Sequence, residues 1–260
     1  MNISIGEIPL CLHVPEKELL EKACSRYGQF LSASPEALPI FLQAAGDAVN
    51  QTASTDSPEF SYKWNDALLL WRGAEAYFEG VGHEYGLDSL IRILLSVLLV
   101  PRRGFLLHAA TILRGNHTYV FTGHSGAGKS TVASLSPRGS VLTDEISLLR
   151  VVEDHADKKH FHEEMWHAYG TPFWGDFRAE GANTHAPIKG IYVLVQDSEN
   201  RVERISPREG VRAMLPNVLF FSRDRGSTAG LLGLLAAVAQ RVPCYKLFFR
   251  RECSFWEVIE

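Results

Sequence analysis

The decisive stretch of this sequence is Tyr119-Val120-Phe121-Thr122-Gly123-His124-Ser125-Gly126-Ala127-Gly128-Lys129-Ser130-Thr131. From Gly123 to Ser130 it fits the pattern Gly-x-x-x-x-Gly-Lys-[Ser/Thr] in full. A strand-like apolar run leads into the glycines, and a helix-compatible run, 131–135, follows them. A strand, a glycine-rich loop and a helix in this order predict that residues 123–131 form a phosphate-binding loop.

The residue types of this loop explain how it would bind phosphate. Glycines let backbone N–H groups turn inward around an anion, Lys129 reaches the β- and γ-phosphates, and the Ser130 hydroxyl binds Mg²⁺. A competing interpretation is the Gly-x-Ser-x-Gly nucleophile elbow of serine hydrolases, centred on Ser125. Ala127 replaces the last glycine of that motif, and the last histidine is His185, which leaves only 60 residues after Ser125 to supply both the acid and the base. The sequence therefore favours a nucleotide site over a hydrolase.

A pair of acidic residues follows the loop. Asp144 and Glu145 end the apolar run 141–143, and Asp144 comes 15 residues after Lys129. That spacing leaves room for one short helix and a strand that returns beside the loop. One carboxylate could then hold Mg²⁺ together with Ser130, and the other could accept a proton from an attacking hydroxyl. The alternative is a solvated strand end without a chemical role.

A single histidine interrupts the apolar run that precedes the loop. Runs 105–113 and 118–122, separated by the turn-like residues 114–117, predict a β-hairpin. His108 would lie on the hairpin strand antiparallel to the one that enters the loop. It is either a satisfied core residue or a group that points at the acidic pair.

Together these segments resemble a known family. Leu107-His108-Ala109-Ala110, the glycine-rich loop and 141–145 resemble the HPr kinase/phosphorylase-like family, whose nucleotide-binding core phosphoenolpyruvate carboxykinases share. Further matching segments are 169–175, 187–195, and the ending 242–250 with 254–257. The resemblance is closest to HPr kinase-related proteins of peptide-modification gene clusters, and it covers about 105–260. Two departures are Asp144-Glu145, where HPr kinases have two aspartates, and the absence of their Glu-x-Arg-Gly element.

The resemblance implies an activity and roles for individual residues. It implies a kinase that transfers a phosphoryl group from ATP, GTP or pyrophosphate, with Mg²⁺, to a serine of a protein or peptide. Asp144 is then the catalytic aspartate, Lys129 and Ser130 contact phosphate and Mg²⁺, and His108 lies near the reaction. The competing class is a non-catalytic nucleotide-binding sensor module.

The order of elements predicts an α/β protein in two parts. Residues 1–87 are expected to form a smaller α/β domain, and 88–104 a linking helix and turn, capped at Asp88-Ser89. Residues 105–260 are expected to form the nucleotide-binding domain. Its strands follow one another too closely for a regular doubly wound sheet, so a mixed sheet is expected.

Composition limits the partners. The net charge of −4 lacks the basic excess of nucleic-acid-binding proteins. No apolar run approaches the roughly 20 residues of a membrane span, and the four cysteines show no disulfide or metal spacing, so a cytoplasmic protein is expected. Formation of a homo-oligomer is left open.

Two weaker signals concern histidines and arginines. His162 and His167 are five residues apart, not the four of a zinc-protease helix, so the cluster of histidines at 155, 160, 162 and 167 is expected to be a solvated loop or strand edge. Arg178, Arg223 and Arg225 are considered as phosphate contacts, although a plain surface position is expected for each.

Overall fold

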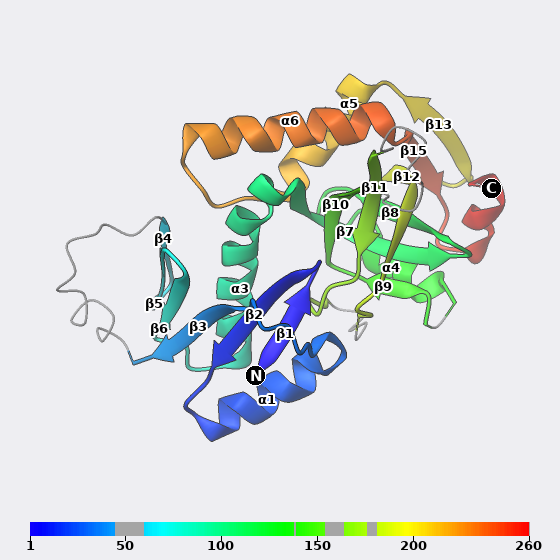
Figure 1. The fold of residues 1–260 in the computed structure, drawn as a ribbon. Helices are drawn as coiled ribbons and strands as arrows, with labels where there is room; N and C mark the ends of the chain where they lie inside the picture. The colour runs from blue at the N-terminus through cyan, green and yellow to red at the C-terminus, as the bar shows by residue number, and fades with distance from the viewer. Residues whose placement is uncertain (45–59, 138, 154–163, 176–180, 260) are drawn as a thin grey trace. The chain divides into compact units, whose positions relative to one another are not determined.

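The structure, a computed structural model, describes residues 1–44, 60–137, 139–153, 164–175 and 181–259. The chain divides into two compact units, Met1–Val97 and Leu98–Glu260. Each unit contains a mixed β-sheet with helices, so the expected α/β class is confirmed (Figure 1). The division falls inside the segment 88–104 that the sequence suggested as a link. Among the described residues, no helix is long and apolar enough to cross a membrane.

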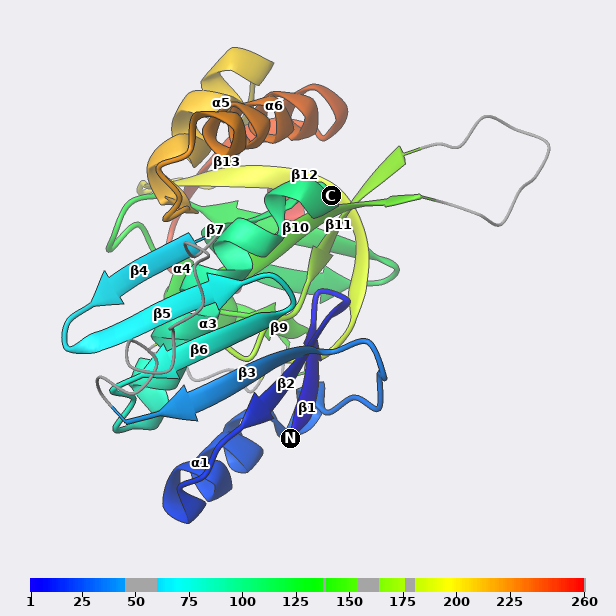
Figure 2. The same cartoon turned by 60° about the vertical axis from the view of Figure 1, so that its left-hand side comes forward.

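The first unit is built on a six-stranded sheet in the order β1-β2-β3-β6-β5-β4 (Figure 2). Strands β2, β3 and β6 run parallel, and the other neighbours are antiparallel. The elements are β1 (Asn2–Ile5), β2 (Ile8–His13), α1 (Lys17–Tyr27), β3 (Leu38–Gln43), β4 (Phe60–Trp64), β5 (Ala67–Arg72), β6 (Glu75–Glu79) and α3 (Glu84–Leu98).

The expected cap at Asp88-Ser89 is wrong, because helix α3 begins at Glu84. The ring of His83 accepts a hydrogen bond from the Gly86 N–H (3.1 Å), which satisfies one of the first backbone donors of the helix. Asp88 lies in the helix interior, buried, and pairs with Arg26 of α1 while it accepts the Tyr27 hydroxyl. The acidic residue that looked like a cap therefore joins two helices.

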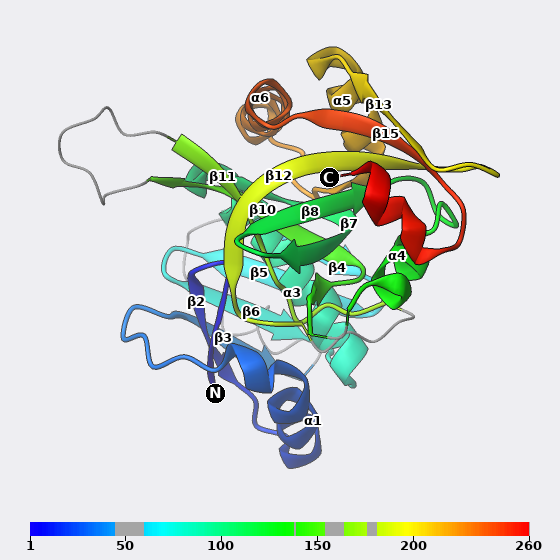
Figure 3. The same ribbon diagram turned by 90° about the vertical axis from the view of Figure 1, so that its right-hand side faces the viewer.

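The second unit is built on a sheet in the order β11-β10-β7-β8-β12-β15-β13, with β9 and β14 paired to β7 (Figure 3). Strands β8, β12 and β15 run parallel to one another. The elements are β7 (Gly104–Arg114), β8 (His117–Thr122), α4 (Lys129–Leu135), β9 (Val141–Thr143), β10 (Ile146–Glu153), β11 (Glu164–Tyr169), β12 (His185–Gln196), β13 (Arg201–Ile205), α5 (Pro207–Met214), β14 (Val218–Leu219), α6 (Arg225–Arg241), β15 (Cys244–Phe249) and the 3₁₀ segment η4 (Cys253–Val258).

Side chains alternate between the two faces of this sheet, as they must on strands. Leu107 and Ala109 of β7 pack with Leu235 of α6 on one face. Ala110 and Ile112 point to the other face and pack with Val132 of α4 and the aromatic residues of η4. The sheet is thus the middle layer, with the glycine-rich loop and α4 on the second face.

The predicted hairpin is confirmed, with β7 and β8 paired antiparallel from Ala109↔Thr122 to Arg114↔His117. The acidic pair directly follows β9, as the sequence predicted, and β10 begins immediately after it. Both β9 and β10 pair antiparallel with β7, at Thr111↔Thr143 and at His108↔Ile146. The Ala109 N–H also donates to the Glu145 carbonyl (2.9 Å). Asp144 and Glu145 therefore form a bend within one continuous path along β7.

Candidate functional site

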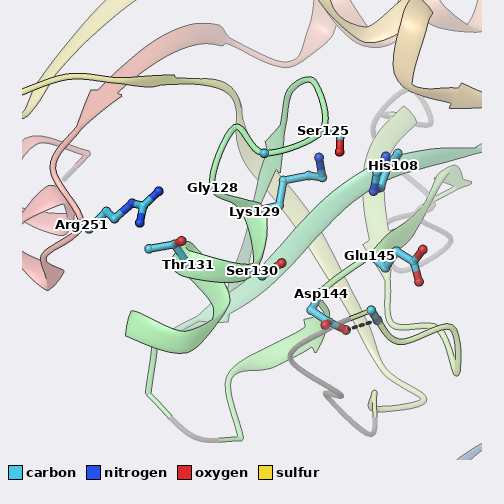
Figure 4. Close-up of a pocket in the computed structure, with 11 residues that line it drawn as sticks. His108, Ser125, Gly128, Lys129, Ser130, Thr131, Asp144, Glu145 and Arg251 are labelled. Atoms are coloured by element: carbon cyan, nitrogen blue, oxygen red, sulfur yellow. Dashed lines mark hydrogen bonds between the residues drawn. The ribbon is translucent and has the colours of Figure 1, made fainter.

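A polar pocket of about 340 Å³ lies at the edge where the parallel strands β8, β12 and β15 end. This edge is the usual ligand-binding edge of sheets with parallel strands. The lining residues are polar, charged or glycine (Figure 4): His108, Ser125, Gly126, Gly128, Lys129, Ser130, Thr131, Asp144, Glu145, Gly175 and Arg251. The pocket therefore combines the glycine-rich loop, the acidic pair and the hairpin histidine that the sequence singled out separately.

The glycine-rich loop needs glycine where the backbone turns sharply. Gly126 and Gly128 have φ angles of 79° and 113°, which side chains disfavour. At Gly128 an added Cβ would come within 2.5 Å of the Phe249 ring, so the loop packs directly on β15. The Gln196 side-chain amide, at the end of β12, donates to the Gly126 carbonyl (2.7 Å). Two neighbouring strands thus fix the shape of the loop.

Lys129 is held inside the loop. Its ammonium donates to the carbonyls of Gly123 (2.9 Å) and His124 (3.2 Å), and the side chain is buried. Burial lowers the pKa of the Lys129 ammonium, and the charge of Glu145 opposes that shift. The loop therefore encloses a positive charge at the floor of the pocket.

The loop residues do not all face the pocket. Ser125, Gly126, Gly128, Lys129, Ser130 and Thr131 line it. Ala127 is instead buried in the core, where its methyl group would contact a Cβ at Gly123. The ring of His124 lies 2.6 Å from the Ser125 carbonyl and is exposed. Of the nine residues predicted to bind nucleotide, Gly123, His124 and Ala127 thus shape the loop and do not line the pocket.

Asp144 is buried and oriented by the backbone. Its Oδ1 accepts the Gly175 N–H (3.1 Å), and a Cβ at Gly175 would crowd Asp144 Oδ2 (3.3 Å) and the Glu145 Cβ (3.2 Å). Gly175 therefore has room beside the acidic pair only because it lacks a side chain. Its amide holds the Asp144 carboxylate in place.

Buried hydroxyl groups brace the bend that carries the acids. Thr143 and Thr171 both donate to the Ile146 carbonyl, at 3.1 and 2.5 Å. Thr143 also contacts the Phe173 carbonyl (3.4 Å). The bend is thereby tied to the segment 171–175 that supplies Gly175.

His108 lies where the hairpin interpretation placed it. It faces Ile146 across the strand pair, and its carbonyl accepts the Thr122 hydroxyl (3.0 Å) at the entrance to the loop. Its partly buried side chain lines the pocket beside Glu145 (Figure 4). His108 therefore lines the same pocket as the acidic pair.

Two pocket residues were not among the predicted site residues, although Gly175 belongs to the segment 169–175 that carries part of the resemblance. Arg251 follows β15, and Gly175 follows the aromatic segment after β11. The signal for Arg251 was available, since the predicted strand 245–249 is followed at once by two arginines. Recognising it required knowing that this strand runs parallel to β8. Gly175 contributes a backbone N–H, a group that residues of nearly every type have, so the sequence gives no signal for it.

The oxygen groups of the pocket suit Mg²⁺. Ser130, Asp144 and Glu145 supply one hydroxyl and two carboxylates to the same pocket. In phosphate-binding sites Mg²⁺ typically takes one or two carboxylates and completes its octahedron with substrate phosphates and water. Within the described ranges, no group of three or more His, Cys, Asp and Glu residues is placed to hold a metal alone.

Of the weaker candidates, those within the described residues do not line this pocket. His155, His160, His162 and Arg178 lie outside the described residues. His167 is buried on β11 with its Nδ1 2.8 Å from that of His185. Arg223 and Arg225 are exposed and do not line the pocket.

Comparison with known protein families and with curated protein sequences finds no match for this chain.

Proposed function

We propose that this protein is a Mg²⁺- and ATP-dependent kinase that phosphorylates a serine hydroxyl of a protein or peptide. This is the activity that its resemblance to the HPr kinase-like family implies. The observation that supports it best is that the Lys129 loop and the buried Asp144 carboxylate line one pocket. Phosphoryl transfer needs both: positive groups that neutralise the phosphates, and an oriented base for the acceptor.

The loop and Lys129 would hold the phosphates of the donor. The backbone of 125–131 surrounds the space above Lys129, whose ammonium can turn from the loop carbonyls to a phosphate oxygen. The hydroxyl of Ser130 and the carboxylate of Glu145 would hold Mg²⁺, which neutralises charge on the transferring group. GTP or pyrophosphate would meet the same groups.

Asp144 would act on the acceptor. The Gly175 amide fixes its Oδ1, so the carboxylate can accept a hydrogen bond from the serine hydroxyl in a defined direction. As the serine oxygen forms its bond to the terminal phosphorus, the bond from that phosphorus to the bridging oxygen breaks. The hydroxyl proton passes to the Asp144 carboxylate. His108, beside Glu145, would help to position the acidic pair.

Binding is the first test. With ligand at 100 times its Kd, stabilisation should be about 2.7 kcal/mol, which raises the melting temperature by roughly 5–10 °C. Lys129→Ala should remove this shift. If Mg-ATP, Mg-GTP and Mg-pyrophosphate all leave the melting temperature unchanged, the phosphate-loop assignment is wrong.

Transfer is the second test, with labelled ATP and serine peptides encoded by neighbouring genes. Asp144→Asn should bind Mg-ATP normally and lose transfer by a factor of about 100 or more. Glu203→Gln removes an exposed carboxylate on β13, outside the pocket, and serves as the matched control. Binding without transfer to any serine peptide by the wild type would instead indicate a nucleotide sensor.

A further inference from the structure

Arg251 is held at the mouth of the pocket by a fixed turn. Asn200 brackets this turn: its Oδ1 accepts the Arg250 N–H (2.8 Å) and its Nδ2 donates to the Ser254 hydroxyl (2.9 Å). The following segment is anchored by Phe255 and Trp256, both buried in the core that also contains Phe249 of β15. The residue therefore projects from a well-packed base.

The two arginines of the turn are used differently. The guanidinium of Arg250 pairs with Glu252 (2.5 Å). Arg251 is exposed, lines the pocket, and makes no hydrogen bond or ion pair with any residue in the described ranges. A guanidinium is the side chain best matched to phosphate, because its planar donors can pair with two oxygens at once. Arg251 is thus available to bind an anionic ligand, whereas Arg250 is already paired with Glu252.

The pocket has two chemically different ends. In Figure 4, Arg251 and Thr131 lie on one side of the glycine-rich loop, and His108 and Glu145 lie on the other, with Lys129 between them. The end near Arg251 is positive, and the opposite end carries the acidic pair. A chain of phosphates in this pocket therefore meets unlike surroundings at its two ends.

This asymmetry gives the phosphate chain a direction. The transferred phosphoryl group must lie at the acidic end, because the proton acceptor is there and Mg²⁺ can offset the repulsion between carboxylates and phosphate. The phosphates that stay behind then extend past Lys129 toward Arg251. A guanidinium stabilises these phosphates without a metal ion.

We propose that Arg251 binds the phosphate nearest the nucleoside of a nucleoside triphosphate, and so fixes the direction of the donor in the pocket. This inference rests on the proposed function. Apart from the His108 imidazole, the lining residues in the described part of the chain include no aromatic or aliphatic side chain. The donor is therefore recognised by its phosphates, and the base contributes little.

The test compares Mg-ADP with Mg-pyrophosphate, which carry two phosphates each, and adds Mg-ATP and Mg-GTP. Kd values for Mg-ADP, Mg-pyrophosphate, Mg-ATP and Mg-GTP are measured by calorimetry on wild type, Arg251→Ala and Arg250→Ala. Arg251→Ala should raise the Kd of Mg-ADP and Mg-ATP about tenfold or more, and change that of Mg-pyrophosphate less than about twofold. Arg250→Ala, the matched control, should change all of them less than about twofold. ATP and GTP should differ by less than about threefold in the wild type.

Each other outcome has a distinct meaning. If Arg251→Ala weakens ADP and pyrophosphate equally, or neither, the assigned direction is wrong. A preference of more than tenfold between ATP and GTP overturns recognition by phosphates alone. If the wild type binds none of the four ligands, the proposed function is wrong, and the role of Arg251, which rests on it, is wrong with it. Because Arg251 is exposed, unchanged thermal stability of the unliganded variant is expected and confirms that it is folded.

Discussion

Gly128 lies against the ring of Phe249, and this contact predicts how the loop responds to a single added methyl group. A Cβ at Gly128 would be 2.5 Å from Phe249 Cζ and 3.2 Å from Cε1, well inside contact distance. Gly126 provides a matched control, since its φ of 79° is also positive but nothing lies within 4 Å of its ideal Cβ. Gly126→Ala therefore suffers only the backbone penalty, whereas Gly128→Ala suffers the penalty and the steric conflict.

The losses of unfolding free energy in Gly126→Ala and Gly128→Ala should differ by the cost of the clash with Phe249. A non-glycine residue at a positive φ costs about 1–3 kcal/mol, and overpacking a core position costs about 1–3 kcal/mol more. Gly126→Ala should thus lose about 1–3 kcal/mol of unfolding free energy, and Gly128→Ala about 2–6 kcal/mol. Thermal unfolding measures the difference, as a melting temperature at least about 2 °C lower for Gly128→Ala.

A third variant isolates the contact. Phe249→Leu removes the ring edge that the new methyl group meets, so it should lower the penalty of Gly128→Ala by about 1–2 kcal/mol in a double-mutant cycle. Equal losses for Gly126→Ala and Gly128→Ala, with no coupling to Phe249, would refute the argument that β15 shapes the loop.

Three further outcomes follow from the second unit. Burial raises the pKa of the Cys244 thiol to about 11, above the unfolded value near 9. The contribution of this thiol to stability is therefore complete below pH 9 and is lost as the pH rises from 9 to 11. In urea titrations over that range, the unfolding free energy of Cys244→Ala should fall less steeply with pH than that of the wild type. Thr171→Val keeps the shape but removes the donor to the Ile146 carbonyl, and should lower stability by about 1–3 kcal/mol, measured by thermal unfolding; no loss would contradict a bracing role. Ser206→Ala breaks the capping box that Ser206 forms with Glu209 at α5, and should cost about 1 kcal/mol by the same measurement, whereas the neighbouring exposed Arg208→Ala should change it little.

Much of the second unit was predictable because its local signals agree. The apolar runs around residues 114–117 can pair only as a hairpin, and the register Ala109↔Thr122 places His108 one residue beyond the pairing, next to the loop entrance. Glycine spacing located the loop, because few other structures need glycines followed by Lys129 and Ser130. These features depend on neighbours in sequence, which pattern and turn chemistry describe well.

What the sequence could not show depends on partners distant in the chain. The run 146–153 is as apolar as 141–143, but only pairing with β7 reveals that both belong to one path. The sequence pattern predicted Asp88 as a helix cap, whereas in the structure its partner is Arg26, 62 positions earlier in the chain. Arg251 reaches the pocket only because β15 lies parallel to β12, itself parallel to β8.

The continuous pairing of β9 and β10 along β7 also limits how this protein can diverge. Sites on loops drift readily, since insertions there leave the scaffold in place. Asp144 and Glu145 instead lie in a bend between β9 and β10, and both of these strands pair with β7. Gain or loss of one residue between 146 and 150, where β10 pairs with β7 in regular register, would turn the following side chains to the wrong face of the sheet. Descendants of this chain should therefore vary in length outside β7 and β10, and keep the register in which these two strands pair.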